Sequence, residues 1–225
     1  TIRREYEGLA SIGSVLYGVA EFDTELCNTG SDPVTGLASD LRIFRTPGTY
    51  PQANGVSGPI GPQIGETCFP SGFTEAAAAY NATDGWIYAI ASDDTLPANA
   101  PRSRLFRISP TTGLATQIGS GATAAGLIKT ADSQGGDENP YFDGLAVTAD
   151  GRIFASENRF NNNAGANGAI YQLFATGANA GRARFITNTL PTDVNRDTGL
   201  AAFGNTLYLL LEDGRVYTIT DLTPG

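Results

Sequence analysis

The chain has 225 residues, with 14 Lys and Arg against 23 Asp and Glu, no histidine and a formal net charge of −9. This acidic balance and the scattered arginines argue against a nucleic-acid partner, because phosphate binding requires a basic patch. The lack of histidine excludes Ser-His-Asp and Cys-His nucleophile systems and His-based zinc sites, so any metal must be held by hard oxygen ligands. No apolar run approaches the length of a membrane span.

Four segments share one pattern, in which two short apolar strands are joined by a tight turn rich in Gly, Asp or Asn. These hairpins occupy residues 7–19, 75–90, 142–155 and 198–209. A pattern that recurs from one end of the chain to the other is typical of a repeat protein and favours a single domain over residues 1–225.

Further strands follow each hairpin, and their apolar and polar residues alternate as in half-buried strands. A third strand is expected at 41–45, 105–108, 169–173 and 215–219, and a fourth at 62–65, 116–119 and 184–187. The last repeat has no fourth strand, whereas residues 1–4 stand just before the first hairpin. We therefore expect an all-β, four-bladed β-propeller of four-stranded antiparallel blades, its ring closed by the N-terminal strand.

Each second and third strand carries Phe or Tyr at a matching place. These aromatic residues are Tyr17, Tyr88, Phe154 and Tyr208 in the second strands, and Phe44, Phe106, Tyr171 and Tyr217 in the third. We expect them to form the core between the sheets rather than a stack for a ligand.

The small and aromatic positions of these repeats resemble β-propeller repeats of the NHL-type, strictosidine-synthase-like and phytase-like kinds. The resemblance covers the whole chain and specifies fold better than function. It implies a propeller in which loops around an axial channel carry any activity, often together with calcium.

Most long loops are expected on one face of the blades, which is where a rigid scaffold usually carries function, although neutral drift in loop length is the alternative. Cys27 and Cys68 would lie in neighbouring loops of that face, which makes a disulfide reasonable. A disulfide and the absence of Met both favour a processed protein that is secreted, extracellular or periplasmic. Two free thiols in a cytosolic protein, or a trimmed chain, remain alternatives.

An acidic residue stands at or just before the start of each first strand. These residues are Glu7, Glu75, Asp143 and Asp197. Fourfold geometry would bring them toward the channel, where like charges repel unless they are compensated. A hard cation such as Ca²⁺, which takes about six to eight oxygen ligands, would fit there. The alternative is that these carboxylates only cap strands.

A second acidic cluster covers residues 132–139 and includes Asp137. Its alternating oxygens and glycines suit a calcium loop, but the spacing is not that of an EF-hand, and a solvated loop is the simpler interpretation. Apolar residues between 122 and 128 are a further candidate for an exposed contact surface.

These features favour a non-catalytic binding or assembly module of an exported protein, with the long-loop face as its interaction surface, a protein or a second copy as partner, and a structural calcium ion as an optional component. The alternative is a calcium-dependent phosphoesterase or lactonase of the propeller type, in which carboxylates hold a metal that activates water. Phosphate substrates would also need basic residues, for which Arg3, Arg4, Arg159 and Arg196 are the candidates. Sugar binding through Tyr50, Tyr141 and Phe160 is a third option.

Overall fold

The computed structural model describes residues 5–21, 38–47, 63–70, 75–92, 96–97, 99–136, 138–157, 169–187, 198–211 and 213–224. These residues form an all-β structure with several antiparallel sheets, in which the only helical pieces are the 3-10 turns η1 (Gly121–Thr123) and η2 (Gly177–Asn179). The all-β fold class expected from the sequence is therefore confirmed.

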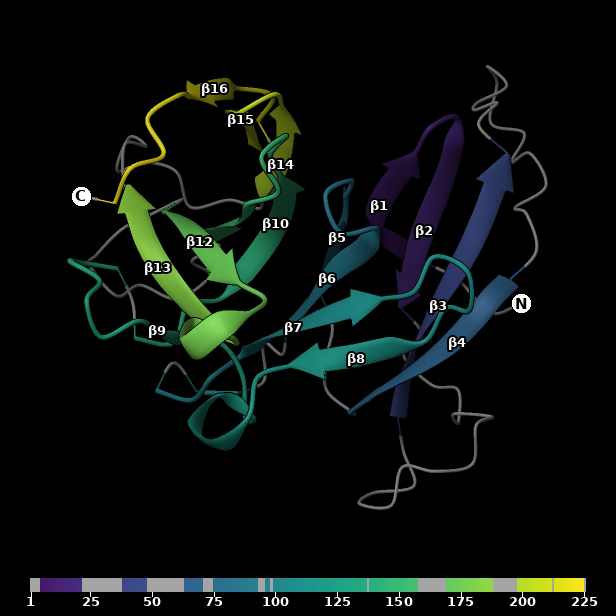
Figure 1. Ribbon diagram of the computed structural model, residues 1–225, viewed down its shortest axis with the longest axis horizontal. Helices are drawn as coiled ribbons and strands as arrows, with labels where there is room; N and C mark the ends of the chain where they lie inside the picture. The colour runs from purple at the N-terminus through teal and green to yellow at the C-terminus, as the bar shows by residue number, and fades with distance from the viewer. Residues whose placement is uncertain are drawn as a thin grey trace.

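The strands form four sheets that follow one another along the chain (Figure 1). The first sheet contains β1 (Glu5–Ile12), β2 (Val15–Glu21), β3 (Ala38–Pro47) and β4 (Gln63–Pro70). The second contains β5 (Glu75–Asn81), β6 (Trp86–Ser92), β7 (Ser103–Ile108) and β8 (Ala115–Ile118). The third contains β10 (Phe142–Val147), β11 (Ile153–Glu157), β12 (Ile170–Phe174), β13 (Arg182–Thr187) and β9 (Ile128–Lys129). The fourth contains β14 (Thr198–Phe203), β15 (Thr206–Leu211) and β16 (Val216–Ile219).

All four expected hairpins are confirmed, as the pairs β1–β2, β5–β6, β10–β11 and β14–β15. Each of their turns contains a glycine at positive φ, a conformation that other residues adopt only with strain. Two turns are fixed further by an aspartate that accepts a hydrogen bond from the backbone amide two residues later: Trp86 N donates to Asp84 and Arg152 N donates to Asp150.

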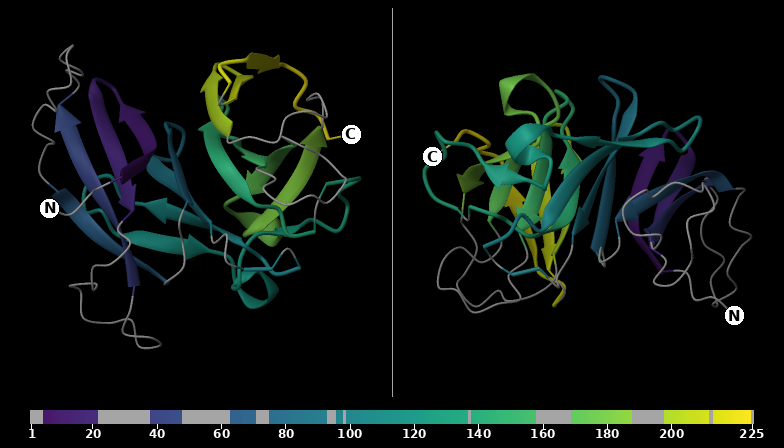
Figure 2. Two further views of the ribbon diagram at one scale, coloured as in Figure 1. Left: turned by 180° about the vertical axis from the view of Figure 1, so that it is seen from behind. Right: turned by 90° about the horizontal axis from the view of Figure 1, so that it is seen from below.

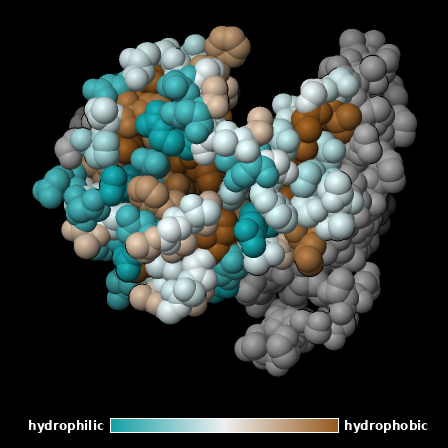
Figure 3. Space-filling view, viewed as in Figure 1, coloured by the Kyte–Doolittle hydropathy of each residue, from teal (hydrophilic) through white to brown (hydrophobic). Residues whose placement is uncertain are grey.

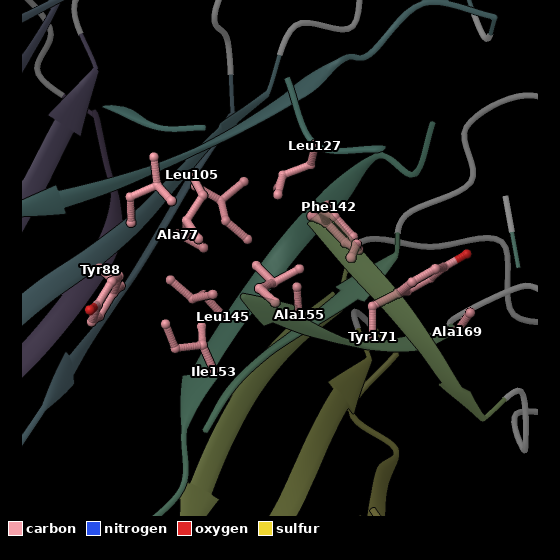
Figure 4. Packing of buried hydrophobic residues seen from close by; sticks show 14 residues of the cluster. Ala77, Tyr88, Leu105, Leu127, Phe142, Leu145, Ile153, Ala155, Ala169 and Tyr171 are labelled. Carbon is pink, nitrogen blue, oxygen red and sulfur yellow. The ribbon is translucent and has the colours of Figure 1, made fainter. Parts of the chain in front are cut away.

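Consecutive sheets pack face to face, and each pair shares one apolar cluster. The cluster between the second and third sheets is the largest and includes Tyr88, Leu105, Phe142 and Tyr171 (Figure 4). The first strands of the sheets also contact one another in chain order, β1 with β5, β5 with β10 and β10 with β14. Among the described residues, no comparable packing joins β14 to β1.

The first and fourth sheets therefore lie on opposite sides of an open space, which we call the hollow (Figures 1 and 2). In the space-filling view the surface is notched between these two parts of the molecule (Figure 3). Among the described residues, the second and third sheets are therefore covered on both faces, whereas each of the two end sheets packs against another sheet on one face only.

Several expectations from the sequence need correction. Strand β4 continues to Pro70, so Cys68 lies in a strand opposite Asp40 and not in a loop. The short strand β9 pairs in parallel with β13 and was not anticipated, because two residues carry no periodic signal. Leu127, expected to be exposed, is 1% exposed because it packs into the cluster between the second and third sheets.

The expectation that the matching aromatic residues form the core holds for most of those whose side chains are described. Tyr17, Tyr88, Phe154, Phe106 and Tyr171 are buried. Their equivalent in the fourth sheet, Tyr208, is 36% exposed and contradicts the expectation. The physical reason is that the face carrying this residue borders the hollow, where none of the described strands packs on it.

Candidate functional site

The first strands of all four sheets surround one cavity of about 220 Å³. Each strand contributes three consecutive residues, at positions 9–11, 78–80, 145–147 and 200–202. These residues are mostly small or aliphatic and include no charged side chain. The cavity therefore marks where the four sheets converge, and its lining offers no charged group.

The strand-start carboxylates do not occupy four equivalent positions. Glu7 and Asp143 both lie where the register of the strand shifts, between Tyr6 and Gly8 in β1 and between Phe142 and Gly144 in β10. Such a bulge inserts one residue and re-aims the side chains beside it. Glu75 instead begins a regular ladder opposite Ser92, so the match that the sequence indicated for it is wrong in register.

Only Asp143 among these carboxylates has a described side chain, and it is half-buried. Asp197 and Asp137 lie outside the described residues, as do the side chains of Glu7 and Glu75. The binding of a cation by these groups stays a prediction. The same holds for the disulfide, because Cys27 and the side chain of Cys68 also fall outside the described residues.

The start of β10 is fixed by a buried polar connection to the second sheet. The Ser92 hydroxyl donates to the carbonyl oxygen of Phe142 at 3.0 Å and lies 2.8 Å from the hydroxyl of Ser103. Ser103 in turn accepts from the backbone amide of Phe142 at 3.1 Å. Both serines are fully buried, so these bonds satisfy polar groups that would otherwise be costly inside the protein.

A buried acid lies beside this connection. The Tyr171 hydroxyl donates to Glu157 Oε2 at 2.9 Å, and both residues are essentially inaccessible to solvent. Phe142 and Phe185 contact the Tyr171 ring edge to face, with centroids 5.3 Å and 5.7 Å away. Aromatic packing on both sides holds the hydroxyl in place, and the arrangement is that of a rigid core rather than an accessible catalytic centre.

The acidic segment 132–139 is attached to the third sheet. Asp132 pairs with Arg184 at 2.6 Å, and Glu138 pairs with Lys129 at 2.7 Å. The Phe185 amide donates to Ser133 Oγ at 3.0 Å. In the described part of the chain, no group of three Asp, Glu, Cys or His side chains is placed to hold a metal. The described carboxylates of this segment thus connect it to β13 through Arg184 and to β9 through Lys129.

Four exposed large apolar side chains of the described residues lie on the fourth sheet, on the face toward the hollow. Its members are Phe203 (82% exposed), Val216 (58%), Leu210 (50%) and Tyr208 (36%). The ladder places Leu210 opposite Val216 and Phe203 opposite Thr206, which puts all four on one face. We call these four residues the apolar face.

Sequence reasoning missed the apolar face, although β15 contained a signal for it. Its sequence, Thr-Leu-Tyr-Leu-Leu-Leu, is apolar at almost every position, whereas a strand with one solvated face alternates. The inward residues Leu207, Leu209 and Leu211 are buried against the third sheet. The outward Tyr208 and Leu210 are apolar as well, as in a strand covered on both sides.

In the described part of the chain, the fourth sheet also has an edge with no further strand beside it. It contains three strands, ending at β16, whereas each of the other sheets has a fourth strand at that position. Beside β16 is a cavity of about 450 Å³, lined from the third sheet by Ile186 and Thr187 and from the fourth by Thr218 to Asp221 and Thr223. The expected occupant of this edge, residues 1–4, lies outside the described residues.

The other sequence candidates contribute no site. Tyr141, considered for sugar binding, is 3% exposed beneath the guanidinium of Arg102. Tyr50 and Phe160 lie outside the described residues, as do the arginines considered for phosphate.

Comparison with known proteins gives no match, either to a family model or to a curated protein. Within the described ranges, no helix has the length and apolar character needed to cross a membrane.

Proposed function

We propose that this chain is a non-catalytic binding or assembly module of an exported protein, and that the apolar face is its protein-binding surface. The observation that carries the proposal is the exposure of four large apolar side chains on one face of a sheet. Apolar patches of this kind, on the order of 300–600 Å² on a typical monomer, are often functional because water contact with them is unfavourable.

The surroundings of the apolar face suit a protein rather than a small polar ligand. Tyr208 offers a ring together with a hydroxyl, a combination enriched in protein interfaces. Leu210 and Val216 form a cross-strand pair, so the ladder fixes their position relative to each other. The partner is a protein surface that brings apolar β-structure to the hollow, and a second copy of this chain is one such surface.

The proposal includes the ring architecture. The four sheets are blades of a four-bladed β-propeller, and residues 1–4 complete the fourth blade beside β16. Support comes from the packing of the sheets in chain order, from the cavity that all four first strands line, and from the uncovered edge of β16. A missing fourth strand leaves unpaired backbone groups that favour the addition of a strand.

The last part of the proposal is that a calcium ion stabilises the fold. Its support is that Glu7 and Asp143 both stand at backbone bulges, in corresponding parts of the first and third sheets. Calorimetry with added Ca²⁺ and the double variant Glu7→Gln with Asp143→Asn tests this element. We expect calcium to raise the melting temperature of the wild type but not of the variant. Calcium-dependent turnover of a phosphate ester or lactone would instead favour the hydrolase.

The main experiment alters the apolar face and compares it with an exposed apolar residue elsewhere. Leu210→Ser and Val216→Ser change the face, while Leu114→Ser changes a residue that is 66% exposed on the turn between β7 and β8. Light scattering over a concentration series measures self-association, and a bait column of the folded protein measures binding of other proteins. We expect only the face variants to weaken association, by at least about tenfold per residue. Equal behaviour of all three variants would reject the apolar face as the binding surface.

A further inference from the structure

Glycines on the first strands mark where the backbones of neighbouring sheets approach closely. A Cβ added at Gly8 would lie 2.9 Å from the backbone nitrogen of Ala78 in the second sheet, and one added at Gly144 would lie 2.8 Å from the nitrogen of Leu200 in the fourth. Real Cβ atoms do not approach backbone that closely, so both positions require glycine. The requirement comes from the neighbouring sheet and not from backbone strain at these two residues.

Gly199 has the same place in the fourth sheet. It pairs with Leu210, just as Gly144 pairs with Ser156 and Gly8 pairs with Val19. Yet a Cβ at Gly199 would meet only the Leu210 Cβ, at 3.9 Å. Glycine in a strand costs stability through backbone entropy, and here the open hollow gives it no local reason. At the corresponding place in β1 and β10, glycine faces a packed neighbouring sheet, and this favours the same arrangement for β14.

The first sheet is the element that can fill this place. Gly8 contacts the second sheet and Gly144 contacts the fourth, so in each case the neighbour is the sheet that follows in the series. After the fourth sheet the series returns to the first, whose Leu9 is 61% exposed toward the hollow. Residues 9–11 and 200–202 already border the same cavity, so the movement needed is a narrowing of the hollow.

We propose that the hollow closes by packing of β1 and β2 onto the apolar face, with Gly199 against the backbone of β1. Closure covers Tyr208 in the way that the fourth sheet covers Phe154, its equivalent in the third. Closure and partner binding then exclude each other, and the closed state regulates the surface. This second statement rests on the proposed function, whereas closure itself does not.

The test is a disulfide across the hollow. In the third and fourth sheets, Phe154 and Leu207 share one cluster. The equivalent pair across the hollow is Tyr208 and Leu16. The double variant Leu16→Cys with Tyr208→Cys is therefore oxidised with glutathione disulfide, which is reduced to two molecules of glutathione as the protein disulfide forms. Peptide mass mapping distinguishes a disulfide between the two introduced cysteines from one that involves Cys27 or Cys68. Mixing isotope-labelled and unlabelled chains separates links within one chain from links between copies.

The matched control adds Gly199→Val to the same pair of cysteines. A Cβ at this position meets only the Leu210 Cβ, at 3.9 Å, and valine suits a strand, so we expect the variant to keep the fold while its side chain blocks closure. We expect a link within one chain whose yield falls at least about tenfold with Gly199→Val, since overpacking of a tight contact is unfavourable. A yield that Gly199→Val leaves unchanged, no link, or links only between copies would each overturn the closure.

A separate measurement, of association through the apolar face, tests the proposed function. Gly199→Val should strengthen association through the apolar face, because it keeps the hollow open. If no closure is found while Leu210→Ser still weakens association, the regulation is wrong and the binding surface stands. If closure occurs and the face variants leave association unchanged, the binding surface is wrong and closure is only the completion of the ring.

Discussion

The contact between the third and fourth sheets gives the most direct test of the packing described above, through Gly144→Ala. The added Cβ would lie 2.8 Å from Leu200 N and 2.9 Å from Leu200 Cβ, and closer still to Ser156 Oγ. The serine side chain can be removed by mutation, but the backbone of β14 must move as a strand. The substitution therefore separates β10 from β14.

The expected magnitude follows from two opposing effects. Overpacking of this kind costs about 1–3 kcal/mol, and the rigid backbone partner places this case near the upper end. Alanine recovers about 0.5–1 kcal/mol of the strand penalty of glycine. The net loss is about 2 kcal/mol, which lowers the melting temperature by roughly 4–8 °C for a chain of this size.

Urea unfolding followed by near-ultraviolet circular dichroism measures this loss. Gly8→Ala, against Ala78, should behave in the same way, because the second sheet offers an equally close backbone atom. Adding Ser156→Ala to Gly144→Ala should recover only part of the loss, since the contact with Leu200 remains. A loss below about 0.5 kcal/mol, which is the ordinary range for surface substitutions, would show that β10 and β14 do not approach as described.

Three other predictions use different measurements. Deletion of residues 1–4 should lower the free energy of unfolding by about 2 kcal/mol or more, because it uncovers a sheet edge; an unchanged melting temperature would contradict the ring closure. Burial and an acidic hydrogen-bond acceptor raise the pKa of Tyr88 well above its ordinary value. The unfolded chain therefore loses this proton first, and stability should fall as the pH rises above about 10, less steeply in Tyr88→Phe. Alkylation without reductant followed by intact-mass measurement should leave Cys27 and Cys68 unmodified; two labelled thiols would exclude their disulfide.

Local patterns were enough to predict the hairpins. The glycine turns and the short apolar runs place β10 and β11 within a residue or two, since both signals act between near neighbours in sequence. The regular alternation likewise placed β7 and β12. What the pattern could not provide was register. Asp143 and Glu75 each stand next to a small residue at the start of a strand, so their sequence contexts look alike. The first lies in a bulge and the second in a regular ladder, so their pairing differs by one residue.

The sequence pattern also could not predict which side chains are buried in the last sheet of the series. Tyr88 and Tyr208 occupy the same place in their repeats, and nothing in either side chain distinguishes them. One is 3% exposed and the other 36%. The difference comes from whether another sheet follows, which is a property of the whole arrangement. A repeat pattern thus predicts what each sheet presents to its neighbour, but it does not say where the series stops.

The acidic segment 132–139 shows how composition can suggest a ligand site where the fold uses the same residues for support. Gly136 has φ +72, and a Cβ there would lie 2.6 Å from the Tyr171 hydroxyl, so this glycine lets the segment lie directly over the buried tyrosine. Asp132 then reaches Arg184 on β13. A calcium loop also needs glycines and carboxylates, but with its oxygens directed to one point. Here the described carboxylates diverge to cations on the third sheet, so the segment encloses the Tyr171–Glu157 pair from outside.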